Sequence, residues 1–587
     1  MGNFIDVSNN KEYTYSKISP KKGEMNMKVV IVGGVAGGAS AAARLRRLNE
    51  DMEIVILERS AYISYANCGL PYYIGGSIQD KEVLTLQTPK SFYERFRIDV
   101  RTLNEVIQIN KEDKKVIVRN LKDNCVYEES YDKLILSPGA KAIMPPIEGI
   151  GHSFVFSLRT VEDTMKIDSY LNEHIVKKAV VVGAGFIGLE MAENLKKRGI
   201  DVTIVQLTSQ VMAPLDEDMA TVVHQYLKEQ NIHLLLETSL TKIIKKDGKT
   251  YAVLNNEEEL DCDLILMAVG VQPDTMIAKV AGIELGIKGA IKVNKYMQTN
   301  IKDIYAIGDA VEVKHFITHQ DTLISLAGPA NKQGRIIANH ISGIDSEYKG
   351  SQGSSILKLF DLHIASTGLN EREAKAQNLN YDYAFITSSS HATYYPNSKS
   401  MYIKVVFDKD NGRILGSQII GFDGVDKRID VLATAIRAHM SAYDLTELEL
   451  AYAPPFSSAK DPINMVGFVI ENILTNKVKQ MHWNEVCESN DSIILDTRTL
   501  YEYNKGHYTN AYHIPLDELR ERMDELDHTK TIKVYCHSGL RSYIACRILS
   551  QKGFDCINIA GGYSIYEIMK KDVFLARKLL PCGKRDD

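Results

Sequence analysis

The chain has 587 residues, which is too long for one hydrophobic core and predicts three or four domains. Its composition is ordinary, 44% hydrophobic and 25% charged, and its net charge of -5 favours neither nucleic acid nor an anionic membrane as a partner. The longest mainly apolar stretch, residues 29–43, contains four glycines and is too short to span a bilayer. Residues 1–27 are polar and lack the apolar segment of a secretory signal, so we expect a disordered leader there.

The eight cysteines lie far apart, at positions 68, 125, 262, 487, 536, 546, 556 and 582. No two of them form a CxxC pair, which argues against a zinc ribbon or a thioredoxin motif, and we predict no metal site. Irregular spacing in a large chain favours free thiols in a reducing compartment. The sequence therefore predicts a cytoplasmic protein.

A first glycine-rich turn follows a β-branched run at residues 28–32 and leads into an alanine-rich helix. It begins with Gly33 and ends with Gly38, although a valine stands where the second glycine of GxGxxG belongs. Such a turn alone could simply let a helix pack on a strand. Glu58, however, ends the next strand, where an acid binds the adenosine ribose, and Asp309 ends the run IYAIGD, where a carboxylate can face a ribitol hydroxyl. Together these features predict an FAD site.

A second turn is complete, with Gly183, Gly185 and Gly188 between a strand at residues 179–182 and a helix that reaches about residue 198. A second dinucleotide fold predicts a nicotinamide cofactor beside the flavin. Gln206 occupies the position where an acid usually binds the 2′-hydroxyl, and no arginine follows to bind a 2′-phosphate. The choice between NADH and NADPH therefore stays open.

Cys68 lies in the string SYANCGLPYYIGG, shortly after Glu58 and at an expected helix start. A free cysteine is most often a buried, inert thiol. A helix N-terminus, in contrast, lowers the pKa of a thiol, and we expect a reactive thiolate here. Tyr73 stands five residues later, so a disulfide within this string is excluded.

Residues 28–470 resemble the single-cysteine branch of the pyridine nucleotide-disulfide oxidoreductases, and the strings GGVAGG and SYANCGLPYYIGG are similar to coenzyme A-disulfide reductases. The resemblance implies that Cys68 alternates between a thiolate and a mixed disulfide with coenzyme A. It also implies a homodimer, in which Tyr394 and Tyr452 assist Cys68 from the partner subunit. Phe186 and Glu190 match the family's nicotinamide-gating aromatic residue and its acidic neighbour. Coenzyme A, as substrate or bound thiol, would contact Arg44, Arg47, Ser64, Asn67, Thr88 and Arg95.

Cys536 opens the loop CHSGLRS directly after an expected strand. Successive backbone N–H groups at the start of the next helix would cradle its sulfur and stabilise a thiolate or persulfide. Four residues separate Cys536 from Arg541, one fewer than in related phosphatases, which favours sulfur over phosphate. The C-terminal segment resembles a single rhodanese domain over its whole length.

The order of expected strands and helices predicts an α/β protein. It has two Rossmann-like dinucleotide-binding domains, an α+β dimerisation domain and a C-terminal α/β rhodanese domain. The expected boundaries are a leader at 1–27, a discontinuous FAD-binding domain at 28–145 and 270–345, a NAD(P)-binding domain at 146–269, a dimerisation domain at 346–475 and a rhodanese domain at 481–587.

These features favour an FAD-dependent NAD(P)H reductase of coenzyme A disulfide, or of coenzyme A persulfide and polysulfide, with a fused sulfurtransferase domain. Its partners would be small sulfur compounds and a second copy of the chain, with no nucleic acid and no membrane. One alternative is an NADH oxidase or peroxidase that uses a Cys68 sulfenate. Ala36 counts against it, because that branch typically has a histidine there. The other is a sulfur-relay or redox-sensing protein with slow flavin chemistry, but a pure relay needs no nicotinamide site.

Overall fold

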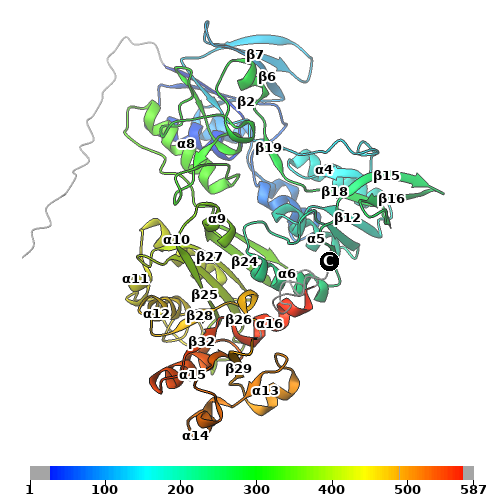
Figure 1. Ribbon diagram of the computed structural model, residues 1–587. Coiled ribbons are helices and arrows are strands. Elements are labelled where there is room, and N and C mark those ends of the chain that lie inside the picture. Colours follow the sequence, from blue (N-terminus) through cyan, green and yellow to red (C-terminus); the bar gives the residue numbers. More distant parts are fainter. Residues whose placement is uncertain (1–26, 488, 573–587) are drawn as a thin grey trace, which may run out of the picture.

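The computed structural model describes residues 27–487 and 489–572. The expected leader, apart from Met27, and the last part of the expected rhodanese domain lie outside the described residues. Each of four α/β units is built around a five-stranded sheet (Figure 1). Every helix in the described part of the chain is too short or too polar to cross a membrane.

The first unit contains a parallel sheet whose central strands are almost fully buried. Its strands are, in spatial order, β20 (Ile304–Ala306), β9 (Lys133–Leu136), β1 (Lys28–Val32), β2 (Glu53–Glu58) and β5 (Asp99–Thr102). Helices α1 (Ala36–Leu48) and α8 (Ala327–Ile341) pack closely, since a Cβ atom on Gly334 would lie 2.6 Å from the Gly37 carbonyl oxygen. Beside them lies an antiparallel sheet of β6 (Asn104–Asn110), β7 (Lys115–Asn120) and β8 (Val126–Ser130).

The second unit repeats this plan. Its parallel strands are, in spatial order, β11 (Val155–Ser157), β18 (Leu264–Met267), β12 (Lys178–Val182), β13 (Asp201–Val205) and β14 (His233–Leu235). Its helices are α4 (Val161–Glu173), α5 (Phe186–Lys197) and α6 (Glu217–Glu229), and its small antiparallel sheet consists of β15 (Leu240–Lys246), β16 (Lys249–Leu254) and β17 (Glu259–Asp261). Both dinucleotide folds are therefore present.

The third unit is antiparallel. Its strands are, in spatial order, β23 (Ser355–Leu359), β24 (Leu362–Gly368), β27 (Ile414–Gly421), β26 (Ser400–Asp408) and β25 (Tyr381–Ser389). Every residue of β27 is buried, because helix α10 (Val425–Arg437) and the second unit cover the sheet. Helices α11 (Ala442–Thr446) and α12 (Pro462–Leu474) complete the unit.

The fourth unit has a parallel sheet again. Its strands are, in spatial order, β28 (Lys479–Met481), β32 (Cys556–Ile559), β31 (Thr531–Tyr535), β29 (Ser492–Asp496) and β30 (Tyr512–His513). Its main helices are α13 (Leu500–Lys505), α15 (Leu540–Gln551) and α16 (Gly562–Lys571), and α16 lies against α6 of the second unit (Figure 1).

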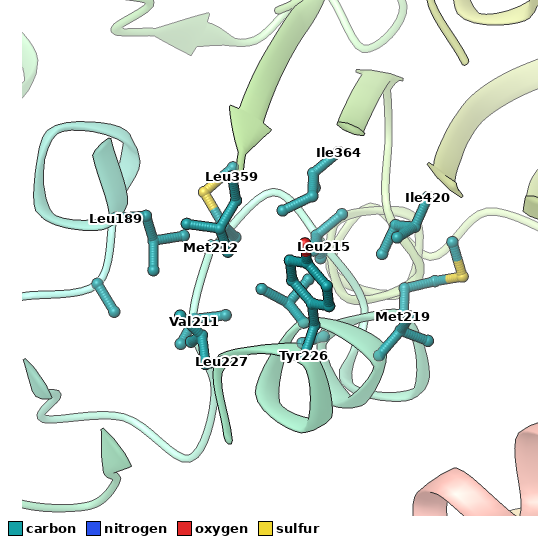
Figure 2. Close-up of a cluster of buried hydrophobic side chains, with 14 of the residues drawn as sticks. Leu189, Val211, Met212, Leu215, Met219, Tyr226, Leu227, Leu359, Ile364 and Ile420 are labelled. Carbon is teal, nitrogen blue, oxygen red and sulfur yellow. The ribbon is translucent and has the colours of Figure 1, made fainter. Parts of the chain in front are cut away.

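A continuous hydrophobic cluster joins the units. Figure 2 shows its part between the second and third units, where Leu215 and Tyr226 from the segment around α6 lie near Ile364 and Ile420. The same cluster extends to Trp483 and other aromatic residues of the fourth unit. The fourth unit therefore shares a core with the rest of the molecule.

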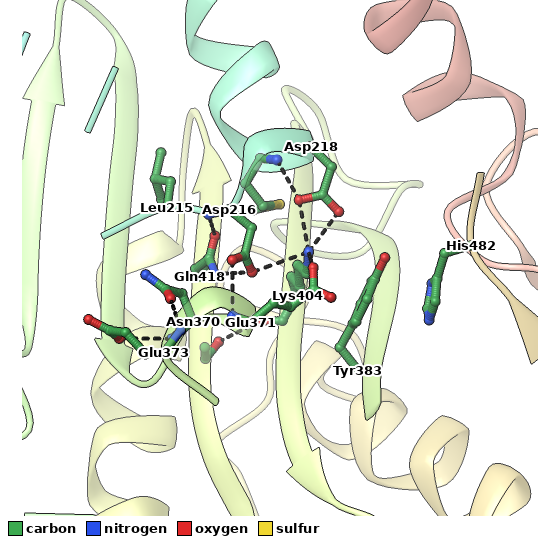
Figure 3. A network of polar contacts seen from close by, with 12 residues as sticks. Leu215, Asp216, Asp218, Asn370, Glu371, Glu373, Tyr383, Lys404, Gln418 and His482 are labelled. Atoms are coloured by element: carbon green, nitrogen blue, oxygen red, sulfur yellow. Dashed lines mark hydrogen bonds and ion pairs between the residues drawn. The ribbon is translucent and has the colours of Figure 1, made fainter. Parts of the chain in front are cut away.

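Lys404 on β26 is fully buried at the centre of a polar network (Figure 3). Its ammonium nitrogen lies 2.8 Å from Asp218, 2.5 Å from Glu371 and 3.2 Å from Asp216. Burial alone would lower the pKa of Lys404, but the three carboxylates raise it well above its ordinary value. Carboxylates grouped this closely could hold a metal ion, yet here the ammonium group of Lys404 is their counter-ion.

The ring of Tyr383 connects this network to the fourth unit. Lys404 lies 3.9 Å from the centre of the ring, and the imidazole of His482 stacks on it with ring centres 3.7 Å apart. His482 also pairs with Asp382 at 3.1 Å, and the Gln480 side chain donates a hydrogen bond of 2.8 Å to the Tyr383 carbonyl. These contacts fix the fourth unit on the edge strand β25.

Replacing Lys404 with methionine should lower the free energy of unfolding by about 3 kcal/mol, because the buried Asp216 and the partly buried Asp218 and Glu371 lose their counter-ion. The loss should grow with pH. Burial already raises the pKa of the Glu371 carboxyl in the folded protein. An acid whose pKa is raised on folding stabilises the folded state at low pH, and this contribution is lost as the pH rises through the pKa of the folded state. Urea unfolding at several pH values measures the free energy of unfolding of the variant and of the wild type.

Lys178→Met, which removes an exposed ion pair with Asp261, is the control. An equal loss of stability in both variants would contradict the prediction.

Candidate active site

The first glycine-rich turn is built so that only glycine fits at its ends. Gly33 has φ +96°, and a Cβ atom on it would lie 2.1 Å from the Ser137 carbonyl oxygen. A Cβ atom on Gly38 would lie 1.9 Å from the Gly33 carbonyl oxygen. Below the turn, the Glu58 carboxylate accepts hydrogen bonds of 2.8 Å from the N–H groups of Gly34 and Ser60, while burial raises its pKa. The backbone of the turn and the N-terminus of α1 therefore lie close together, as binding of a pyrophosphate requires.

The second turn has the same construction. Gly183 has φ +104°, and a Cβ atom on Gly188 would lie 1.9 Å from the Gly183 carbonyl oxygen. Gly185 faces open space, which leaves its backbone accessible to a phosphate. Gln206 has the role in the second turn that Glu58 has in the first. Its side-chain oxygen accepts a hydrogen bond of 2.8 Å from the N–H group of Ala184. Its amide nitrogen donates to Thr208 at 2.6 Å, so this position carries no charge.

Both turns therefore fit the adenosine diphosphate part of a dinucleotide. The Asp309 carboxylate follows β20 after Gly308, which has φ +79°, and it pairs with Arg159. The side-chain oxygen of Asn67 is buried and has no hydrogen-bond partner among the described residues, so an acceptor is available beside Cys68. FAD fits the first turn and NAD(P)H the second.

Cys68 lies in a short 3-10 turn (Asn67–Gly69) that precedes α2 (Leu70–Ile74), and it is exposed. Burial by surrounding atoms and the Glu190 carboxylate raise the pKa of its thiol, while Arg159 acts in the opposite direction. The expected lowering of this pKa is therefore wrong in this structure. The physical reason is first the desolvation of the sulfur by surrounding atoms and then the carboxylate of Glu190 from the second unit, against which a helix of only five residues has little effect.

Glu190 on α5 is the charged group that most affects Cys68. Burial raises the pKa of its carboxyl to about 7, and the Tyr72 hydroxyl donates a hydrogen bond of 3.3 Å to it. Phe186 is the first residue of the same helix. The structure thus brings Cys68, Glu190 and Tyr72 from two units to one region, and the sequence analysis did not anticipate Tyr72.

Tyr394 and Tyr452 come together although 58 positions separate them in the chain. Their hydroxyl groups are 2.8 Å apart, and the two side chains are 75% and 47% exposed. Hydrogen bonding to Tyr452 raises the pKa of Tyr394. Within the described residues they bond to each other, and both remain available to a second subunit.

The six residues expected to contact coenzyme A fall on two neighbouring segments. On α1, Arg44 donates a hydrogen bond of 3.0 Å to Asn339, and Arg47 is exposed. On the other segment, β3 (Ile63–Tyr65) pairs antiparallel with β4 (Thr85–Gln87), so that Ser64 lies within the paired segment, Thr88 follows its end at Gln87, and Asn67 lies beyond the opposite end. Thr88 caps helix α3 (Pro89–Phe96), on which Arg95 is exposed.

Cys536 lies at the end of β31, 1% exposed, inside the expected backbone cradle. Its sulfur accepts a hydrogen bond of 3.1 Å from the Gly539 N–H group and one of 3.5 Å from the Ser542 hydroxyl. Gly539 has φ +106°, which favours glycine there. A neighbouring loop supports the cradle, since the Tyr563 N–H group donates to the Cys536 carbonyl at 2.7 Å. This geometry suits a sulfur anion.

Trp483 and Glu502 have roles that the sequence analysis missed. Trp483 is buried, and its indole N–H group donates to the Gly562 carbonyl at 2.7 Å and so fixes the supporting loop. Glu502 forms two hydrogen bonds of 2.7 Å with Arg541. The spacing of Thr499 and Glu502, a capping box on α13, was the available signal, but it does not indicate contact with Arg541.

One of the described cysteines differs from the expectation, and Cys582 lies outside the described residues. Free thiols are found at 68, 125, 262, 536, 546 and 556. Cys487, in contrast, is disulfide-bonded, so the expectation that every cysteine is a free thiol is wrong.

Comparison with known families agrees with this architecture. The family model described as pyridine nucleotide-disulphide oxidoreductase matches residues 27–334, and the dimerisation domain of that family matches residues 354–462. The chain belongs to the pyridine nucleotide-disulphide oxidoreductase family. A rhodanese-like domain matches residues 478–568. The third unit is thus the dimerisation domain and the fourth the rhodanese domain of this oxidoreductase.

Similar proteins share most of the chain. A coenzyme A disulfide reductase of Staphylococcus epidermidis is 39% identical over 443 residues, 75% of this chain and 99% of the relative. The structure of reduced CoADR-RHD from Bacillus anthracis is 47% identical, has a TM-score of 0.91, and the match covers 93% of this chain and 98% of that one. A NAD-dependent persulfide reductase from A. fulgidus is 37% identical with a TM-score of 0.87, and the match covers 92% and 100% of the two chains.

Proposed function

We propose that this oxidoreductase reduces coenzyme A disulfide and coenzyme A persulfide or polysulfide with electrons from NAD(P)H, and that its rhodanese domain handles sulfane sulfur. The observation that carries the proposal is the presence of two different sulfur sites in one chain. Cys68 is exposed beside the flavin turn and has no second cysteine in its string, whereas Cys536 lies in an anion-binding cradle. The names of the similar proteins, a coenzyme A disulfide reductase and a persulfide reductase, support the same substrate class.

Cys68 is the nucleophile of the proposed reaction. Its thiolate attacks one sulfur of coenzyme A disulfide, the substrate S–S bond breaks, and one coenzyme A thiolate leaves. With the persulfide, attack on the sulfur bound to coenzyme A releases hydrosulfide and gives the same mixed disulfide on Cys68. When bound, the flavin supplies the two electrons, which originate as hydride from NAD(P)H, that return Cys68 to the thiolate.

We further propose a homodimer, with residues 346–475 forming the interface. The exposed pair Tyr394 and Tyr452 would then lie beside the partner's substrate and protonate the leaving thiolate. A reducing compartment such as the cytoplasm suits this chemistry, because Cys68 and Cys536 must be free thiols.

The rhodanese domain is fixed by Tyr383 and His482, so its sulfur is not free to swing towards Cys68. A mobile substrate can connect the two sites instead. Coenzyme A carries its thiol at the end of a long pantetheine arm and could accept sulfur at Cys536 and deliver it to Cys68.

Replacing Cys68 with serine should reduce kcat/KM for coenzyme A disulfide and persulfide by on the order of a thousandfold, with flavin still bound, because a hydroxyl cannot form the mixed disulfide. NADH and NADPH oxidation, measured with disulfide, persulfide, peroxide and oxygen as separate acceptors, tests this. Cys125→Ser changes an exposed thiol elsewhere and is the matched control. Turnover that is fast only with peroxide or oxygen would instead support the oxidase or peroxidase alternative.

The double variant Tyr394→Phe/Tyr452→Phe should keep its dimer and flavin but reduce disulfide at about one hundredth of the normal rate, because two hydroxyl donors are lost. Sedimentation and steady-state kinetics measure the two properties. Tyr443→Phe, on an exposed tyrosine of the same domain, should behave as the wild type. A fully active monomer would refute both the dimer and the role of the pair.

Cys536→Ser should leave reduction of preformed coenzyme A disulfide unchanged, because Cys68 suffices for that reaction. Polysulfide-dependent NADH oxidation should increase with added coenzyme A in the intact protein and show no such response in Cys536→Ser. The same response to coenzyme A in both proteins would show that the rhodanese domain takes no part in turnover.

A further inference from the structure

The guanidinium group of Arg541 is held by Glu502 and is not left free for a substrate. Two parallel hydrogen bonds of 2.7 Å join the two side chains, the arrangement in which arginine binds a carboxylate most strongly. Glu502 is itself fixed, because its carboxylate accepts bonds of 3.0 Å and 2.9 Å from the N–H and hydroxyl groups of Thr499. Pairing with Arg541 lowers the pKa of Glu502 to about 2, so this carboxylate is charged at every working pH.

A second arginine behind the Cys536 loop is neutralised in the same way. Arg498 is buried and bonds to the carboxylate of Asp496 at 2.6 Å and 3.0 Å. Its guanidinium group lies 4.0 Å from the ring centre of Tyr563, the residue whose N–H group bonds to Cys536. Arg498 and Arg541, the two arginines whose contacts are described here, therefore each have a carboxylate partner.

Cys536, Glu502 and Arg541 together carry a net negative charge when Cys536 is ionised. The thiolate and Glu502 each contribute one negative charge, and Arg541 contributes one positive charge. The backbone cradle, through the N–H group of Gly539, stabilises the charge on the cysteine sulfur itself. It supplies no free cation for a second anionic group on an incoming donor.

This distinction separates two classes of sulfur donor. Thiosulfate carries an anionic sulfonate directly on the sulfur that Cys536 would attack. In that reaction the Cys536 thiolate bonds to the outer sulfur, the S–S bond breaks, and sulfite leaves with the electron pair. An organic persulfide reacts in the same way, but the leaving group is a thiolate on an uncharged arm. Thiosulfate therefore brings a second anionic group, the sulfonate, to the mouth of the loop, whereas the arm of the persulfide brings none.

We propose that Glu502 determines the donor specificity of Cys536 by neutralising Arg541, so that the loop selects organic persulfides and rejects thiosulfate. This inference rests on the proposed sulfurtransferase role of Cys536. Glu502 acts through Arg541 and is a positioning residue. The exposed neighbours on the two segments, Tyr501 and Leu540, are mainly apolar and fit an uncharged arm better than an oxyanion.

Glu502→Gln in the full-length holoprotein tests the proposal. Glutamine is isosteric and can still accept one hydrogen bond from Arg541, but it leaves the arginine charge uncompensated. Sulfur loading of Cys536 is followed by intact mass, with thiosulfate and with coenzyme A persulfide as separate donors, at the same pH for every variant. The matched control is Glu525→Gln, since Glu525 forms a similar pair with Arg522 in the same domain. Glu502→Asp retains the charge and should retain the wild-type selectivity.

We expect the ratio of loading rates, thiosulfate over persulfide, to rise about tenfold in Glu502→Gln and to remain unchanged in Glu525→Gln. Added salt should reduce this difference, because the effect is electrostatic. Equal loss of loading with both donors in Glu502→Gln would mean that Glu502 only holds the loop together, and would overturn the proposal. Wild-type protein that loads thiosulfate as readily as persulfide would also overturn it. If the wild type loads neither donor, the sulfurtransferase role fails first, and the specificity with it.

Discussion

The buried ammonium group of Lys404 is the constraint on which the arrangement of the domains depends. It belongs to the dimerisation domain, but Asp216 and Asp218, which stabilise its charge, lead into helix α6 of the second dinucleotide unit. A buried cation without these carboxylates would be too costly to retain, so the two units cannot separate without exposing it. Through the ring of Tyr383, the same cation also lies against His482 of the rhodanese domain. The ammonium group of Lys404 thus contacts groups that link three domains.

The two dinucleotide turns satisfy the same backbone group with different chemistry. In each turn, one N–H group donates to a side chain at the end of the second strand, Glu58 in the first and Gln206 in the second. Glu58 remains buried, and its carboxylate suits a pair of ribose hydroxyls. The uncharged Gln206 neither attracts nor repels a 2′-phosphate. Selection between NADH and NADPH by charge at this position is therefore weak in this enzyme.

The parts of the site that sequence analysis predicted are those in which the reason for each residue is local. A glycine turn after a buried strand and a cysteine before a helix bring their own backbone geometry, so Gly183 and Cys536 could be placed from sequence. The pKa of Cys68 was predicted in the wrong direction because surrounding atoms desolvate its sulfur and because Glu190 reaches it from another domain. The pairing of Arg541 with Glu502 was missed for the same reason, since nothing in a capping box indicates its partner across the fold. The Tyr394–Tyr452 pair came from family resemblance, not from periodicity.

Two features of the rhodanese domain bear on which substrate can reach Cys536: the fixed position of the domain and the Glu502–Arg541 pair beside the cysteine. Because the contacts of Tyr383 and His482 hold that domain in place, the proposed function moves sulfur on a carrier that reaches between Cys536 and Cys68. Because Glu502 pairs with Arg541, the proposed selection favours a carrier that presents its sulfur without another negative charge nearby. A thiol at the end of a long, uncharged arm meets both demands at once. The substrate proposed for Cys68 is therefore also the one best suited to visit Cys536, and one molecule can serve both sites.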